Sequence, residues 1–345
     1  MRGIFSSFLS NTGGSAPAVS LDRRRWMLAG GAACCLSAVW PVNPARAQAP
    51  EVVRHLDAAK AAAGDDLLSY LQLADPLMPG HKPEPFDLAQ ALQLPAPAPA
   101  KAFDNLFFLG SGWVSAWAIP TSDGILLIDA LNNDEEGRRI IAGGMQRLGL
   151  DPAQTRTLVV THGHGDHYGA ANWFKRQFNT RIVMSEPDWV MTSTKLEYDT
   201  PLWGRPPQRD VSVKHGDVVK LGDTSLEIVL TPGHTVGTIS PIFQVRDGAN
   251  IHTAMLWGGT AFNFGRNPER MHHYIQSAER ARAIARERGV DVLVSNHAKY
   301  DRATEKLAGI APGKPNPFVM GQDAVQRALT VMSECAQATL ASWSA

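Results

Sequence analysis

The stretch TLVVTHGHGDHYGA, residues 157–170, begins with a short apolar run. Three histidines and an aspartate then follow within six residues. In extended chain His162 and His164 are at positions i and i+2, so their rings leave the same side of the backbone. The intervening glycines let the chain bend tightly where the strand ends. Asp166 and His167 then fall on the turn into the next helix and point back toward the first two histidines. This spacing predicts ligands for two metal centres at the end of a buried strand.

Two more histidines follow predicted strands farther along the chain. His234 stands in Thr-Pro-Gly-His-Thr after a strand at 225–230, and His297 follows a strand at 290–294. Ligand-binding side chains of α/β proteins collect at the carboxyl ends of strands, so we expect these groups to meet. Three protein ligands and one open position are typical of a catalytic zinc ion. The predicted ligands are His162, His164 and His234 for one Zn²⁺ ion, and Asp166, His167 and His297 for a second.

The composition is that of an ordinary globular protein. Of the 345 residues, 44% are hydrophobic and 19% are charged, which is too apolar for an intrinsically disordered chain. Lys and Arg together number 33, as do Asp and Glu, so no net charge favours binding to nucleic acid. Cys335 is the one cysteine after residue 47, which argues against a disulfide or a thiolate zinc site in that part of the chain.

The first 47 residues resemble a twin-arginine export signal. Three arginines at 23–25 precede a Gly/Ala-rich apolar run at 28–40, and Ala-Arg-Ala at 45–47 is typical of a cleavage site. The alternative is a buried or membrane helix, but the run is too short to span a bilayer. We therefore predict residues 1–47 to be a signal peptide, and the cleaved protein to be periplasmic without stable membrane association.

The rest of the chain divides into three predicted regions. Residues 48–102 form a helical extension that ends in the Pro-rich stretch 94–99, a stiff linker or a strap over the body. Residues 103–310 alternate strands and helices, which predicts an α/β domain. Residues 311–345 contain a helix with one apolar face, and we expect it to pack on that domain.

His-x-His-x-Asp-His at 162–167, Pro-Gly-His-Thr at 232–235 and the later His297 together resemble the metallo-β-lactamase superfamily. The resemblance covers roughly residues 103–302. It implies an α/β fold, a four-layer αββα sandwich, with a dinuclear site in a cleft between its two halves. It also implies a hydrolase that acts on a small-molecule substrate.

One absent residue narrows the resemblance. Many members of the superfamily have a Gly-Asp-Thr segment whose aspartate bridges both metals. Here the corresponding stretch 255–262 reads MLWGGTAF, so neither Gly259 nor Thr260 supplies a carboxylate, and no cysteine replaces it. The remaining ligand set is similar to that of the third subclass of metallo-β-lactamases.

Three functions follow as hypotheses. Water held by two zinc ions loses a proton near neutral pH, and the resulting hydroxide would attack the amide carbonyl of a β-lactam ring. Asp166 is the predicted catalytic residue, because its carboxylate can orient that hydroxide. The alternative is a metal-dependent hydrolase of another small ester, lactone or amide. A zinc-binding protein without catalysis is the third, and the complete ligand set argues against it.

Other residues of the expected cleft carry two interpretations each. Thr260 is predicted to hydrogen-bond substrate, or else to be a strand-end threonine bonded to backbone. The segment 198–209 is either a lid over the site or an ordinary surface loop. Trp113 is either part of the cleft rim or plain packing. Lys299 is either a partner for a substrate carboxylate or an ordinary surface charge.

Overall fold

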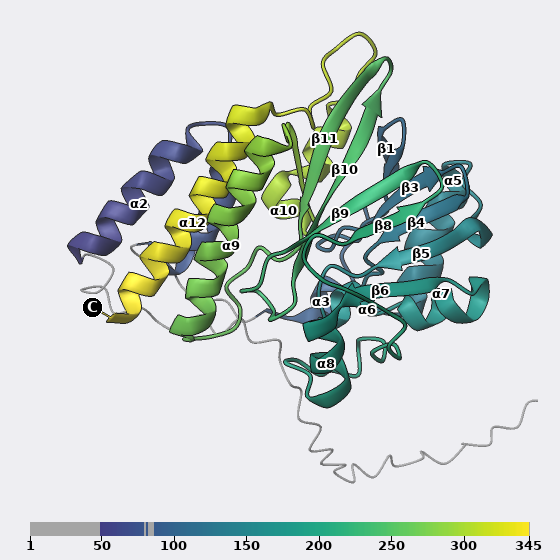
Figure 1. Cartoon of the computed structure of the whole chain (residues 1–345), viewed down its shortest axis with the longest axis horizontal. Coiled ribbons are helices and arrows are strands. Elements are labelled where there is room, and N and C mark those ends of the chain that lie inside the picture. The colour runs from purple at the N-terminus through teal and green to yellow at the C-terminus, as the bar shows by residue number, and fades with distance from the viewer. Residues whose placement is uncertain (1–48, 79–80, 82–85, 345) are drawn as a thin grey trace, which may run out of the picture. The chain divides into compact units, whose positions relative to one another are not determined.

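The computed structural model describes residues 49–78, 81 and 86–344 (Figure 1). The predicted signal peptide, residues 1–47, lies outside the described residues. Within the described part of the chain, no helix has both the length and the apolar character needed to cross a membrane.

The described chain builds two β-sheets. The first has seven strands in the order β1 to β7, antiparallel from β1 to β4 and parallel from β4 to β7. The second has five strands in the order β12-β11-β10-β9-β8, of which only β11 and β12 run parallel. Strands β1 to β7 are Ala100–Phe103, Leu106–Phe108, Trp117–Thr121, Gly124–Ile128, Thr155–Val159, Arg181–Ser185 and Val211–Val213. Strands β8 to β12 are Val218–Leu221, Thr224–Leu230, Ile239–Asp247, Asn250–Trp257 and Val292–Ser295.

Helices cover the outer face of each sheet. Figure 1 shows α2 (Pro50–Ala63), α12 (Gln322–Ser344) and α9 (Pro268–Glu287) side by side on the flank of the five-stranded sheet. Helices α5 (Gly143–Arg147) and α7 (Ala171–Phe178) lie on the other flank, against the seven-stranded sheet. The other helices are η1 (Leu68–Leu77), α3 (Leu88–Ala91), α4 (Asp134–Glu136), η2 (Gly137–Ala142), η3 (Pro152–Gln154), α6 (Gly165–Tyr168), α8 (Glu186–Thr194), α10 (Ala298–Asp301) and α11 (Ala303–Ala308).

Three hydrophobic cores separate these layers, because neighbouring residues on a strand face opposite sides of a sheet. On β4, Leu127 packs under α5 and α7, whereas Ile128 points into the core between the sheets. On β11, Leu256 enters that same middle core, and Met255 packs under α9 and α12. Each such fully buried side chain contributes roughly 1.5–3 kcal/mol. The prediction of an α/β fold with αββα layers is confirmed.

Local structure departs from expectation in one helix. The pattern predicts a single helix from Asn133 to near Gly149, and the structure begins it there, with the Asn133 side chain accepting from the Glu136 amide at 3.1 Å. The middle turn, Gly137–Ala142, is π-helical. Gly137 faces α7 so closely that a Cβ would lie 2.3 Å from the Cβ of Ala170.

Polar residues follow the carboxyl ends of several strands and meet at one edge of the sandwich. Asp129 follows β4, His162 follows β5 after a short extension, and His297 follows β12. His234 comes after β9, and Gly258 directly follows β11. The fold therefore delivers groups from both sheets to one place.

Candidate metal centre

The first group of potential ligands consists of His162, His164 and His234, with one ligand atom of each within 4.8 Å of the others. The Nε2 atoms of His162 and His234 are 3.0 Å apart. All three side chains are buried. These are the three histidines that the sequence predicts for one zinc ion, and the structure brings them together.

The second group of close ligand atoms consists of His162, Asp166 and His167. Asp166 Oδ2 lies 3.3 Å from His167 Nε2 and 3.7 Å from His297 Nε2. The structure thus brings together the predicted second set, Asp166, His167 and His297, and places His162 next to it. Which of these residues bind each ion remains a prediction.

The ring nitrogens on the far side of each histidine are held by the protein. His162 Nδ1 lies 2.7 Å from the Gly258 carbonyl oxygen, and His234 Nδ1 lies 2.8 Å from that of Ala261. His297 Nδ1 lies 2.9 Å from the carbonyl oxygen of Trp113. A ring that donates from Nδ1 keeps an unprotonated Nε2, which is the form that binds a metal ion. The buried Nε2 of His167 makes no well-aligned hydrogen bond and faces the Asp166 carboxylate at 3.3 Å, so the donor set fits metal ions.

Electrostatics at the site agree with that fit. Burial and neighbouring imidazoles depress the pKa of His162 and His234 well below the usual range, and that of His297 to about 3. Burial also opposes charge on His167, but the carboxylates of Asp166 and Asp129 outweigh it and raise its pKa to about 10. The rings of His162, His234 and His297 therefore favour the neutral form. His167 favours the protonated form, and a metal ion would replace that proton.

The sequence analysis did not identify Asp129, whose carboxylate contacts the Nδ1 side of the His167 ring. Its Oδ2 lies 2.8 Å from His167 Nδ1 and accepts from Thr161 Oγ1 at 2.8 Å. Its Oδ1 accepts from the Thr161 amide at 2.7 Å. Asp129 has a φ of 62°, a left-handed backbone conformation. An aspartate directly after the apolar strand β4 was the available signal.

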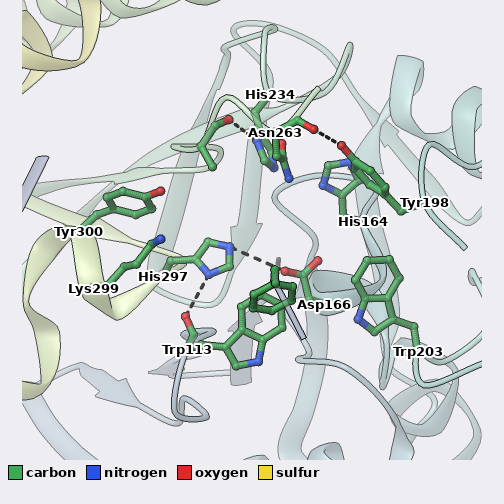
Figure 2. Close-up of a pocket in the computed structure, with 12 residues that line it drawn as sticks. Trp113, His164, Asp166, Tyr198, Trp203, His234, Asn263, His297, Lys299 and Tyr300 are labelled. Atoms are coloured by element: carbon green, nitrogen blue, oxygen red, sulfur yellow. Dashed lines mark hydrogen bonds and ion pairs between the residues drawn. The ribbon is translucent and has the colours of Figure 1, made fainter. Parts of the chain in front are cut away.

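A pocket of about 260 Å³ opens over these ligands (Figure 2). His164, Asp166, His234 and His297 point into it, as Figure 2 shows. Its walls are mostly aromatic. They comprise Phe86, Trp113, Tyr198, Trp203 and Tyr300, together with Ala261, Asn263 and Lys299.

The segment 198–209, predicted as a lid or a surface loop, contributes Tyr198 and Trp203 to that wall. The Trp203 indole donates to Asn132 Oδ1 at 2.9 Å. A Cβ on Gly165 would lie 2.3 Å from the Trp203 ring, so this glycine is needed for close approach. The segment is therefore packed on the histidine-rich turn.

Thr260 lies apart from the pocket. Its side chain is fully buried, its hydroxyl is 3.5 Å from Ser295 Oγ, and it is not among the lining residues. The Thr260 carbonyl accepts a hydrogen bond from Tyr274 at 2.9 Å. The substrate contact predicted for Thr260 stays a prediction, which this placement does not favour.

Comparison with known proteins agrees with the geometry. The family model of the metallo-beta-lactamase superfamily matches residues 110–249. The match covers less than half of the chain, and the fold is similar to that of a solved metallo-beta-lactamase. The described chain thus resembles metallo-beta-lactamases in fold, and it groups His and Asp side chains that could hold a metal ion.

Individual relatives are similar over different extents. A hydroxyacylglutathione hydrolase of Rhodopseudomonas palustris (strain BisA53) is 32% identical over 108 residues, which are 31% of this chain and 34% of the relative. Hydroxyacylglutathione hydrolase GloC of Haemophilus influenzae is 26% identical over 54% of this chain and 89% of its own length. The chain spans only about a third of the length of the first curated relatives it matches.

A solved structure covers more of the chain. BJP-1, a subclass B3 metallo-beta-lactamase of Bradyrhizobium japonicum, superposes with a TM-score of 0.62 at 25% identity. The superposition covers 70% of this chain and 93% of BJP-1.

Proposed function

We propose that this chain is an exported di-zinc hydrolase that opens β-lactam rings in the periplasm. The observation that carries the proposal is the absence of a second carboxylate from the metal groups of the described residues, in which Asp166 is the one acid. At Gly259, one of the two residues that could stand where other members have the bridging aspartate, the backbone itself closes on the histidines. A Cβ on Gly259 would lie 2.5 Å from the Cβ of His234. This lack of a bridging carboxylate supports the ligand set of the third subclass.

The residues present fit the two ions. His162, His164 and His234 would hold one zinc, and Asp166, His167 and His297 the other. Bound zinc would polarise the substrate carbonyl and lower the pKa of water. The Asp166 carboxylate faces the pocket, where it can orient a water molecule or accept its proton. The backbone carbonyls and Asp129 hold the rings in place, so little reorganisation is needed during reaction.

Export rests on the sequence alone. The arginine-rich start, the short apolar run and the Ala-Arg-Ala site support it. A twin-arginine signal carries folded proteins, which suits a chain that takes up metal before export. Action in the periplasm would place the enzyme where β-lactams reach the cell wall.

A second candidate is hydrolysis of another small ester, lactone or amide. The matched hydroxyacylglutathione hydrolases favour an ester-type substrate. The pocket also favours it, since bulky aromatic side chains line it: Tyr198 and Trp203 from the segment 198–209, and Phe86 from the N-terminal region. The Tyr198 hydroxyl additionally donates to the carbonyl of Asn263 across the pocket wall.

The test is a substrate panel run on the zinc-loaded chain. A cephalosporin, a carbapenem, a hydroxyacyl thioester and a lactone are each assayed with and without a chelator. Chelator-sensitive opening of the β-lactams, faster than thioester or lactone hydrolysis, is the expected result. Fast thioester or lactone hydrolysis without ring opening would replace the first function by the second.

A further inference from the structure

An ion pair lies behind the first group of histidines and contacts two of them, His164 and His234. Glu197 and Arg270 meet in a two-pronged contact, with Nη1 2.8 Å from Oε1 and Nη2 2.9 Å from Oε2. Their side chains are 20% and 14% exposed, so the pair is largely shielded from water. We infer that Glu197 and Arg270 are positioning residues that set the affinity of the zinc ion held by His162, His164 and His234. The inference rests on the proposed metal-dependent function.

Glu197 acts on His164. Its Oε2 lies 3.0 Å from His164 Nε2, and both side chains are largely buried. A ring that donates from Nε2 to a carboxylate keeps Nδ1 for a metal ion, and the carboxylate makes that nitrogen more basic. His164 differs here from His162 and His234, whose second nitrogens face neutral backbone carbonyls.

Arg270 acts on the turn that carries His234. Its Nε donates to the Gly233 carbonyl at 2.6 Å, and its Nη2 donates to the His234 carbonyl. The guanidinium also stacks over the Phe264 ring, 4.7 Å from the centroid. Because the guanidinium is planar and rigid, one side chain fixes both the Glu197 carboxylate and the His234 turn.

The pair also connects the pocket wall to His164. Glu197 directly precedes Tyr198, whose ring lies 5.0 Å from that of His164. The second group has a support of its own, since His167 is held by Asp129. Loss of the Glu197–Arg270 pair should therefore lower the affinity for one zinc ion and leave the affinity for the other unchanged.

Zinc titration of the metal-free chain against a chromophoric chelator tests this inference. The variants are Glu197→Gln, Glu197→Ala and Arg270→Lys. The matched control is Glu227→Ala, because Glu227 on β9 also makes a two-pronged contact with an arginine, through Nε and Nη2 of Arg288 at the end of α9. We expect one of the two zinc affinities to fall about tenfold in Glu197→Gln and about a hundredfold in Glu197→Ala. The other affinity, and both in the control, should stay within roughly twofold.

The identity of the weakened ion is read on a second background. Asp166→Ala removes the acidic ligand of the second group, and Glu197→Ala combined with it should still weaken the zinc that remains. Unchanged affinities, or an equal fall in both, would overturn the inference and leave the pair a stabilising contact. A wild-type chain that binds no zinc would instead refute the proposed function itself, and the inference with it.

Discussion

At the scale of single residues, Asp166 joins the second group of ligands to the pocket. Its carboxylate is 3.3 Å from His167 and 3.7 Å from His297, and it lines the space where substrate would bind. Burial opposes its charge, but the surrounding histidines outweigh that and hold its pKa well below the usual range. An anion is therefore built into the site throughout the physiological pH range.

Asp166→Ala should remove most of the second zinc and reduce kcat on the order of a thousandfold, which is about 4 kcal/mol of transition-state stabilisation. The fold should survive, because the neighbouring turn is also held by Asp129 and Trp203. Elemental zinc analysis and turnover on the same sample measure the effect, with the exposed Asp57→Ala as control. Two bound zinc ions with retained turnover would refute the ligand assignment.

The candidate ligands were predictable because their signal is local or stands at a strand end. His162, His164, Asp166 and His167 share one turn, and His234 and His297 each follow an apolar strand. Glu197 and Arg270 carry no such signal. They are brought to His164 and His234 by the folding of a loop and a long helix onto the site, which no short pattern encodes.

At the scale of elements, the turn from β5 into α6 depends on close contact with the loop at 198–209. Gly165→Ala would place a Cβ 2.3 Å from the Trp203 ring, so Trp203 must move and the pocket wall with it. We expect a loss of about 1–3 kcal/mol in unfolding free energy and a raised KM. Chemical denaturation and steady-state kinetics measure both.

Gly143→Ala is the matched control for that substitution. It lies at the start of α5, where an added Cβ meets its nearest atom at an ordinary 3.6 Å. A helical glycine replaced by alanine should gain about 0.5–1 kcal/mol. Equal effects of the two substitutions would contradict the close-packing role of Gly165.

The junction of β12, α10 and α11 contains a buried acid. Asp301 accepts from the amides of Ser295 at 2.8 Å and Ala303 at 3.1 Å, and burial raises its pKa from 3.8 to about 7. Folding therefore favours the protonated form. The contribution of Asp301 to stability is complete below pH 4 and is lost as the pH rises toward 7.

Asp301→Asn has no proton to lose, so it should gain stability relative to the wild type between pH 5 and pH 8. The relative gain is about 2.7 kcal/mol, because about two pKa units between pH 5 and the folded pKa of about 7 contribute 1.36 kcal/mol each. Any pH-independent effect of the amide on the unfolding free energy is the same at both pH values, so it cancels in the difference. Denaturant unfolding of the metal-free proteins measures the difference, and parallel pH profiles for both chains would rule out a titrating Asp301.

The element pattern also shows where sequence reasoning ends. Apolar runs predicted the strands before His234 and His297, at 225–230 and 290–294, and the structure has strands there, β9 and β12. The π-helical turn Gly137–Ala142 had no signal, because its close contact with Ala170 exists only in the folded chain.

At the scale of the whole described chain, the N-terminal region and the last helix belong to one core. Val52 and Leu56 of α2 pack with Leu329 of α12 and Met271 of α9. The four-layer sandwich could be predicted from the resemblance to a known superfamily. The contribution of Phe86 to the pocket wall could not, because it depends on where the chain between α2 and β1 runs.

The central claim is that two zinc ions on these residues carry out hydrolysis. The most direct test is to titrate zinc into the metal-free chain while following both bound metal and hydrolysis of the best substrate of the panel. The account predicts that activity rises with bound zinc, levels off at about two ions per chain and disappears on chelation. Full activity in the metal-free, chelator-treated chain would contradict it.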